Sequence, residues 1–445
     1  MSARTRTLWT FVITSIGLFM VQLDSLVVST AIPVLREDLN ASLEELEWTV
    51  NAYTLTFAVL LLTGAALGDR FGRRRMFAIG VGIFTLGSIL AALAPDVVFL
   101  DIARAVQGIG GAIVTPLTLT ILSAAVPAEK RGLALGAWGG VGGLAIAFGP
   151  VVGGAVVEGI SWQWIFWLNV PIGLVLVPLA LSRLHETRGP ARSLDLPGVA
   201  LGSLGLLGIV WGLVRGNGAG WGSGEVAGTI VAGAVLLVLF VLWELRAEEP
   251  MLPMRFFKNR TFALANVASL FMFFGMFGAI FLLAQFFQTV QGYSPLGAGL
   301  RILPWTLAPM FVAPIAGALS DRIDPRLMIG VGLSMQAGAL AWIAAVSEPT
   351  ASYGAFVAPF AIAGVGMSLF FAPMANVVLG TVRAQEEGQA SGANNAIREV
   401  GAVFGVAVLA AVFAHVGGYE TGDTFTDGST RAVYVGAGAV ALGAI

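Results

Sequence analysis

Long apolar segments alternate with short polar ones along almost the whole chain. A helix needs an apolar run of about 20 residues to cross a bilayer. Transmembrane strands would instead give alternating segments of about 10 residues, which the pattern does not show. We therefore predict an all-α polytopic membrane protein. The expected helices cover residues 11–33, 48–68, 76–94, 97–125, 133–157, 164–182, 196–214, 226–245, 261–287, 297–319, 327–346, 351–380, 388–416 and 432–445.

The two ends of this pattern need separate comment. The last run has only 14 residues, too few to span, so we expect the fourteenth helix to be truncated. The first run follows Arg4 and Arg6, as the apolar part of a signal peptide would. It is too long for one and contains Asp24, so we expect an uncleaved first helix.

Basic residues between the runs indicate the orientation. With a cytoplasmic amino terminus, eighteen of the 24 Lys and Arg residues fall on the inner side, and only Arg36, Arg215 and Arg431 fall in outer loops. Cytoplasmic loops carry an excess of Lys and Arg. We therefore predict a multi-pass protein of the cytoplasmic membrane with its amino terminus inside and an even number of helices.

Composition narrows the possible functions. Hydrophobic residues make up 57% of the chain, charged residues 11%, and the mean hydropathy is +0.86, which excludes a soluble fold of this length. The absence of cysteine excludes disulfides and thiolate chemistry, and two histidines make no metal site. The net charge of -2 indicates no nucleic-acid partner. We find no phosphate-binding loop and no nucleophile with a base, so we expect neither ATP use nor an enzyme.

A possible internal repeat divides the chain. The segments 67–75 and 319–326 both place an Asp-Arg pair directly after an apolar run, on the same side of the membrane. Parallel repeats of this kind are a transporter architecture. We predict an N-terminal six-helix half (1–184), a linker with two inserted helices (185–260) and a C-terminal half (261–445). Chance similarity of two basic cytoplasmic loops is the alternative.

Five short motifs follow one another in order, at residues 23–33, 67–75, 104–108, 149–154 and 162–173. In these motifs the chain resembles the major facilitator superfamily, and within it the fourteen-helix drug:proton antiporters of the multidrug and antiseptic efflux type. It departs from that pattern at Ala65, where glycine is usual, and at Gln163, where arginine is usual. Unlike some members, it has no acidic residue in the run before Asp321, which argues against a preference for divalent organic cations.

The resemblance implies a proton-coupled exporter of amphipathic drugs or other small hydrophobic compounds, driven by the proton gradient without any cofactor. Export of a lipid, a glycolipid or an endogenous secondary metabolite is an alternative. A proton-coupled importer is another, against which the Gly149-Pro150 motif argues. A membrane sensor or scaffold would need a signalling domain that the sequence lacks. We expect a monomer in the bilayer, and whether a periplasmic adaptor takes part is left open.

Asp24 is an acid deep within an apolar run. A charged carboxyl at a helix centre costs about 2.5–3.5 kcal/mol on insertion scales, so it needs a partner or a proton. Arg104 should lie at the same depth in a helix running the other way, and Gln107 follows it on the same helical face. We predict that these three residues couple protons to transport. A structural aspartate and a structural arginine are the simpler alternatives.

Two further groups are expected to act through conformation. Charges and a tight turn at the inner helix ends predict a latch formed by Asp69, Gly72, Arg73, Asp321 and Arg322, unless they only anchor the loops. Small residues in the fifth helix predict close packing with a kink, which the resemblance associates with antiporters: Gly142, Gly149, Pro150, Gly153 and Gly154.

Aromatic and amide side chains within the runs could line a central substrate cavity, because aromatic faces hold flat apolar molecules and attract cations. Each one alone would more often be a lipid-facing or core residue. The candidates are Gln22, Asn51, Tyr53, Phe57, Phe277, Phe281, Gln285, Gln288, Trp305 and Asn376.

Overall fold

The computed structural model describes residues 3–188, 195–320, 322–383 and 386–445, and every element assigned in them is helical. Three short pieces are the 3₁₀-helices η1 (Val28–Thr30) and η2 (Met254–Lys258) and the π-helical turn η3 (Phe286–Val290). The α-helices are α1 (Ala3–Val27), α2 (Ile32–Asp38), α3 (Leu43–Phe71), α4 (Arg73–Ala92), α5 (Val97–Ala125), α6 (Ala128–Gly159), α7 (Trp164–Trp167), α8 (Asn169–Arg183), α9 (Leu196–Ala219), α10 (Gly224–Glu244), α11 (Arg260–Gln285), α12 (Pro295–Thr306), α13 (Ala308–Ser320), α14 (Pro325–Val346), α15 (Gly354–Leu379), α16 (Glu387–Val416) and α17 (Gly422–Gly443).

These helices coincide with the apolar runs of the sequence. Over the described residues, twelve are long and apolar enough to cross a membrane, which confirms the predicted all-α membrane fold. Two long helices are not among these twelve. In α6, the apolar stretch over the described residues is the short one from Phe148 to Gly159, and α17 begins with a polar segment. The number of fourteen spans therefore stays a prediction.

The prediction for the last helix is wrong at its start. α17 begins at Gly422 and has 22 residues. Thr421 and Thr424 form a capping box, which satisfies the first free amides and starts the helix within the polar segment. Residues from Asp423 to Arg431, expected to be an outer loop, therefore form its first turns.

Four predicted runs are not continuous α-helices. The run 11–33 passes from α1 into η1 and α2 after Val27, and the run 164–182 divides into α7 and α8 at Leu168. The run 297–319 divides into α12 and α13 around Leu307. Pro309 lies in the first turn of α13, where its missing amide hydrogen costs nothing, and its ring disfavours continuation of α12 across Leu307. In the run 261–287, α-helical geometry gives way to the π-helical turn η3 after Gln285.

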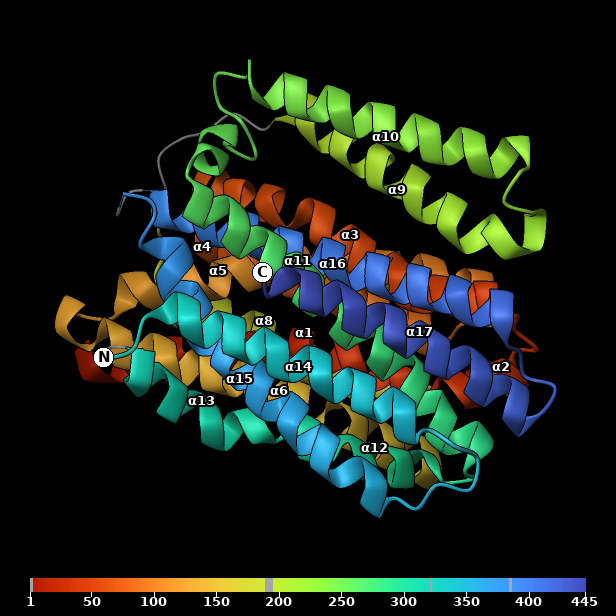
Figure 1. Cartoon of the computed structure of the whole chain (residues 1–445). Coiled ribbons are helices and arrows are strands. Elements are labelled where there is room, and N and C mark those ends of the chain that lie inside the picture. The colour runs from red at the N-terminus through yellow and green to blue at the C-terminus, as the bar shows by residue number, and fades with distance from the viewer. Residues whose placement is uncertain (1–2, 189–194, 321, 384–385) are drawn as a thin grey trace.

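The long helices lie side by side along a common direction, with α9 and α10 as a pair along one side of the bundle (Figure 1). α10 packs on α9, and α9 packs on α3 and α16. Before this pair, α5 packs between α3 and α4, while α1 packs on α6. After it, α11 packs on α16 and α17, and α14 packs on α15 and α17. The two groups meet where α6 packs on α12 and where α3 packs on α16.

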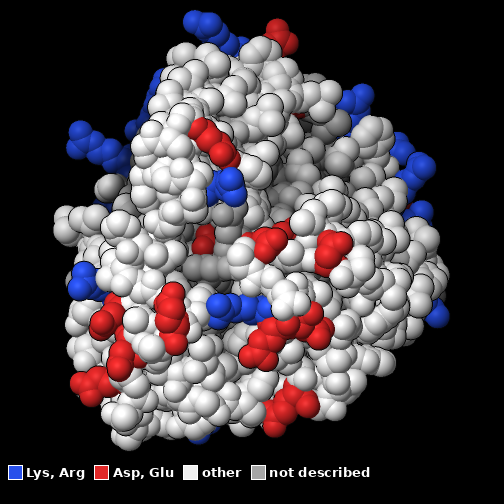
Figure 2. Space-filling model, turned by 90° about the vertical axis from the view of Figure 1, so that its right-hand side faces the viewer, with Lys and Arg blue, Asp and Glu red and all other residues white. Residues whose placement is uncertain are grey.

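The two ends of the bundle differ in charge. One end carries α2, the α9–α10 turn and the start of α17, and Figure 2 shows acidic side chains gathered on it. Among them, Glu37, Asp38, Glu420 and Asp423 are exposed. We call this the α2 end. The other end carries the α3–α4 junction, with its arginines from Arg70 to Arg75.

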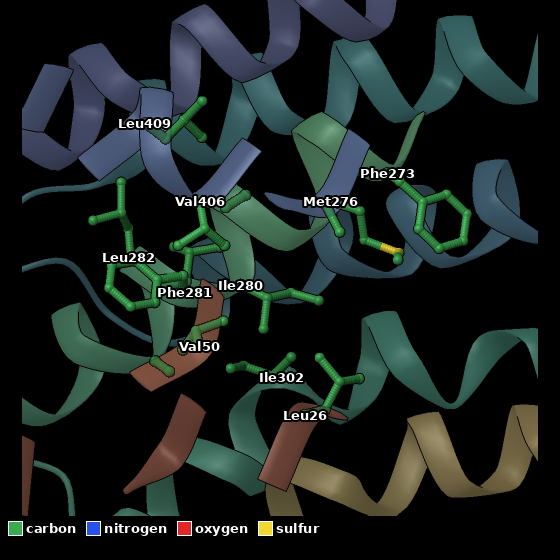
Figure 3. Packing of buried hydrophobic residues seen from close by; sticks show 14 of the residues in the cluster. Leu26, Val50, Phe273, Met276, Ile280, Phe281, Leu282, Ile302, Val406 and Leu409 are labelled. Carbon is green, nitrogen blue, oxygen red and sulfur yellow. The ribbon is translucent and has the colours of Figure 1, made fainter. Parts of the chain in front are cut away.

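Apolar packing joins the two groups of helices near the α2 end. Leu26 of α1 and Val50 of α3 belong to one buried cluster with Ile280 and Phe281 of α11 and Ile302 of α12. Figure 3 shows these side chains directed toward one another between the ribbons. The same cluster extends through the aromatic rings around Phe287, which lies within 6.0 Å of the Phe356 and Phe360 rings.

Candidate functional site

Asp24 and Arg104 form a buried ion pair between α1 and α5. Arg104 Nη1 donates to Asp24 Oδ2, and the two side chains are 1% and 0% exposed. Charges this far from water persist only when paired and hydrogen-bonded. The side chains expected at equal depth in neighbouring helices thus lie together.

Amide side chains complete the coordination of the carboxylate. Gln107 Nε2 donates to Asp24 Oδ1 at 3.1 Å, and Asn169 Nδ2 from α8 donates to the same oxygen at 2.9 Å. Gln107 Oε1 accepts from Arg104 Nη1 at 2.9 Å, and its Nε2 also reaches Ser88 Oγ of α4 at 2.8 Å. Side chains of α5 and α8 therefore surround the carboxylate of α1 with donors only, and Ser88 of α4 holds Gln107 in place.

The other side of Arg104 faces α3. Its Nε donates to the Thr49 carbonyl at 3.2 Å, and its guanidinium carbon lies 4.3 Å from the centre of the Tyr53 ring. The Thr49 hydroxyl donates to Asp101 Oδ1 at 2.9 Å, so a second acid lies one turn before Arg104 in α5. The guanidinium has alternative acceptors and an aromatic face within reach when Asp24 is neutral.

The predicted glycine stripe of α6 lies against α1. A Cβ atom on Gly149 would come within 3.0 Å of Leu26 Cβ, and one on Gly153 would lie 2.6 Å from the Val27 carbonyl. Gly142 meets Leu18 in the same way. Only glycine allows backbones to approach this closely. The stripe therefore fixes α1 both before and after Asp24.

Pro150 and Gly154 face the other group of helices. A Cβ on Gly154 would lie 2.3 Å from the Pro295 carbonyl of α12, and one on Gly299 would lie 2.3 Å from the Pro150 carbonyl. α6 thus contacts α1 with one set of glycines and α12 with another.

Further contacts close the α2 end. Gln288 Nε2 donates to the Thr30 carbonyl at 3.1 Å. Arg36 stacks over the Tyr419 ring at 3.6 Å, and the Tyr419 hydroxyl donates to Gln285. Burial raises the pKa of Tyr419, against the effect of Arg36, so its hydroxyl stays protonated and able to donate. The contacts of Gln288 and Arg36 join the α1–α2 region to residues from α11 onward, and the Tyr419 hydrogen bond ties the end of α11 to the segment before α17.

A cavity of about 740 Å³ opens at the other end, between the two groups. α3 and α5 form one wall, with Thr115 and Asp69, and α6 contributes Trp138. The start of α16, with Asn395, and the segment after α10 complete it. Trp138 Nε1 and Thr115 Oγ1 are buried without a hydrogen-bond partner among the described residues. They can therefore bond to a ligand.

The residues that we expected to line the cavity lie elsewhere in this conformation. None is among the described lining residues. Tyr53 and Phe57 stack within the core at 5.8 Å, Phe281 and Trp305 are almost fully buried, and Phe277 packs on the cluster around Phe273. Gln285 and Gln288 form hydrogen bonds near the closed α2 end, and Asn376 bonds to Ser320. Gln22 is half-buried, and the buried amide of Asn51 has no hydrogen-bond partner among the described residues. Contacts that close the α2 end hold Gln285 and Gln288, whereas Asn376 is exposed.

The α3–α4 junction, which we expected to act as a latch, forms its ion pair between two of its own residues, Asp69 and Arg73. Arg73 Nη2 lies 2.8 Å from Asp69 Oδ1, across the turn at Gly72, whose φ of 104° suits glycine. Glu186 packs against that turn and accepts from the Arg74 amide at 3.0 Å. Asp69 and Arg73 also line the cavity mouth.

Only part of the matching loop can be compared. Asp321 lies outside the described residues, and Arg322 is exposed, with its amide bonded to the Leu319 carbonyl. A different ion pair bridges this end: Arg255 Nη2, in η2, lies 2.7 Å from Glu386 Oε1, just before α16.

Sequence reasoning missed Asn169, Trp138 and Thr115. Asn169 lies in the motif at 162–173, and an amide inside an apolar run was the signal for it. Trp138 and Thr115 resemble ordinary membrane-helix residues, and only their unpaired donors beside a cavity distinguish them.

Comparison with known proteins gives a consistent result. The family model described as Major Facilitator Superfamily matches residues 14–406 and 265–445. The "Multidrug resistance protein Stp" of Mycobacterium tuberculosis is 35% identical over 92% of this chain and 76% of its own length. The "Tetracenomycin C resistance and export protein" of Streptomyces glaucescens is 33% identical over 94% and 77%. The crystal structure of a POT family transporter in complex with a thioalcohol-conjugated peptide shares the fold, with a TM-score of 0.70, 14% identity and coverage of 99% and 94%.

Proposed function

Because the chain belongs to the major facilitator superfamily, we propose that it exports amphipathic drugs or similar small compounds across the cytoplasmic membrane in exchange for protons. The names of the two relatives support drug and antibiotic export. The observation that carries the proton exchange is the buried Asp24–Arg104 pair, in which one acid inside the membrane balances one base.

The coupling follows from the contacts of Asp24. Protonation removes the charge that holds Arg104, and the guanidinium then keeps Gln107 and the Thr49 carbonyl as acceptors. α1 is released from α5 while its following turns remain fixed to α6. Since α6 also carries the close contact with α12, a shift of α1 reaches the closed α2 end. Two discrete packings of such an interface provide alternating access.

Substrate enters in this scheme from the cavity beside Trp138 and Thr115. The positive-inside rule supports assigning that end to the cytoplasm, with the acidic α2 end outside. The structure then represents the conformation that is open to the cytoplasm. The proposed topology has fourteen spans, with both termini on the cytoplasmic side. Two six-helix halves, 1–184 and 261–445, move against each other, while α9 and α10 stay beside them in the linker region 185–260.

An endogenous secondary metabolite is a second candidate substrate, since one relative is named for resistance to and export of tetracenomycin C. The transport chemistry would be the same. In either case the proton gradient drives transport by a single copy of the chain.

Accumulation of a fluorescent drug in cells that express the protein tests this function. We expect lower accumulation than in cells with an empty vector, and recovery of accumulation when an uncoupler collapses the proton gradient. Accumulation that rises on expression would identify an importer. Accumulation that stays unchanged with every compound tested would contradict transport of drugs altogether.

A further inference from the structure

Arg398 has no part in the scheme above, although it lies within a membrane-spanning segment. It is in the first half of α16, inside the span Gln389–Val416. Ionisable side chains within spans are costly, and they usually face a cavity or a functional partner. The residues that contact Arg398 therefore bear on which ligand it could bind.

The charge of Arg398 is not matched by an ion pair among the described residues. Its one described hydrogen bond runs from Nη1 to Asn395 Oδ1 at 3.1 Å. Glu399 follows it in sequence, but adjacent residues of a helix point in different directions. Glu399 acts on Arg398 electrostatically, but no ion pair or hydrogen bond joins the two among the described residues. A guanidinium has five N–H donors, so most of those on Arg398 remain available.

Aromatic rings hold the guanidinium in place. Its central carbon lies 4.4 Å from the centre of the Phe273 ring of α11 and 5.0 Å from that of Phe371 of α15. The two rings meet edge to face at 5.6 Å. Figure 3 places Phe273 at the end of the buried cluster remote from Phe281 and Leu282. Stacking on such rings leaves the N–H edge of an arginine free to bind.

A recess of about 80 Å³ lies beside this edge. Phe370, Phe371 and Met374 form its apolar walls, and Arg398 is the one charged residue among its described lining residues. Ser391 and Asn395 line both this recess and the large cavity, so the two adjoin. The space admits one ring or one acidic group of a larger molecule.

We propose that Arg398 and its recess form a subsite for flat aromatic substrates that carry an anionic oxygen group. The charged group enters the recess beside Phe371 and Met374 and binds the free N–H edge of Arg398. The aromatic ring system lies in the adjoining cavity near Asn395. This inference rests on the proposed export function and adds a preference for the charge of the substrate.

Equilibrium binding to the purified full chain tests it with three probes on one scaffold: anthraquinone sulfonate, anthraquinone carboxamide and anthraquinone trimethylammonium. We expect the wild type to bind the sulfonate most tightly. Arg398→Gln should weaken sulfonate binding about tenfold or more, as loss of a charge-assisted hydrogen bond does. Binding of the carboxamide should change little, and binding of the ammonium probe should strengthen because a like charge is removed.

Arg301→Gln is the matched control, because Arg301 also stacks on two rings, those of Tyr293 and Tyr353, but lies outside both cavities. It should leave the order of the three affinities unchanged. Equal weakening of all three probes by Arg398→Gln would mean a structural arginine and would overturn the subsite while leaving drug export intact. A wild type that binds none of the probes would count against the subsite and the proposed function together.

Discussion

Asn169 donates a hydrogen bond of 2.9 Å to Asp24 Oδ1, the same oxygen that accepts from Gln107. The carboxylate is thereby tied to α8 as well as to α5. Three side-chain donors converge on it and fix its position between α5 and α8. Loss of one donor should therefore weaken the coupling of proton and substrate before it destroys transport.

Asn169→Ala removes one of the neutral donors. Because the carboxylate loses a hydrogen bond and its tie to α8, the number of protons released per substrate bound should fall. Asn217→Ala is a control, since Asn217 bonds the Ala411 carbonyl at 2.6 Å, between α9 and α16. Substrate-induced proton release from the purified variants measures both effects. A release that falls equally in the two variants would mean that the bond from Asn169 has no special effect on coupling.

Gly154→Ala should disfavour closure of the α2 end. The added Cβ would lie 2.3 Å from the Pro295 carbonyl, and overpacking of this kind costs about 1–3 kcal/mol. The variant should favour the conformation in which this end is open. Gly140→Ala is the control, because nothing lies within 4 Å of a Cβ at that position.

The sequence has no cysteine, so spin labels on Glu37→Cys and Glu420→Cys can report the distance across the α2 end. Gly154→Ala should lengthen that distance and Gly140→Ala should not. An unchanged distribution with Gly154→Ala would show that the contact between α6 and α12 is not what closes this end.

Asp69→Asn should slow turnover while leaving substrate affinity largely intact. Its partner Arg73 lies 2.8 Å away and both side chains are partly exposed, so the loss in stability should be below about 1 kcal/mol. Arg75→Gln changes a neighbouring exposed charge and serves as the control. Parallel measurement of binding and of transport rate separates the two effects. A matched loss of affinity and rate would indicate that Asp69 binds substrate at the cavity mouth.

Asp195 caps α9 and should contribute to stability in a pH-dependent way. Burial raises its pKa, but hydrogen bonds from the Gly198 amide, the Trp243 indole, Glu244 and the Met251 amide together outweigh burial and lower it. A carboxyl with a depressed folded pKa stabilises the fold above its unfolded value, near 3.9, and loses that contribution as the pH falls.

Asp195→Ala should therefore lower the free energy of unfolding at neutral pH by roughly 1 kcal/mol, the contribution of a helix cap, and the melting temperature should fall with it. The difference from the wild type should shrink as the pH falls below about 4. Asp195→Asn keeps a good cap and should lose less. Thermal unfolding over a pH series measures this, and a difference that grows on acidification would refute the assignment.

The positions of most helices could be predicted from the sequence, because the length and hydropathy of a membrane helix are local properties. The depth of Asp24 and Arg104 could also be estimated, because helical rise is constant. The cavity could not. Whether Phe281 or Trp305 faces a cavity depends on which end of the bundle is closed, and that is decided by contacts between distant helices. The early start of α17 was missed because a capping box outweighed a polar composition.

Proton coupling at Asp24 is the central claim, and drug-induced proton release from the purified protein across a pH series tests it most directly. Asp24→Asn keeps the shape of the side chain and removes the titrating group. The account predicts no proton release and no pumping against a gradient by this variant, although it folds and still binds neutral substrates. Asp101→Asn, which changes the nearby acid beside Thr49, should release protons as the wild type does. If Asp24→Asn still releases protons while Asp101→Asn does not, the coupling acid is Asp101 and the account is contradicted.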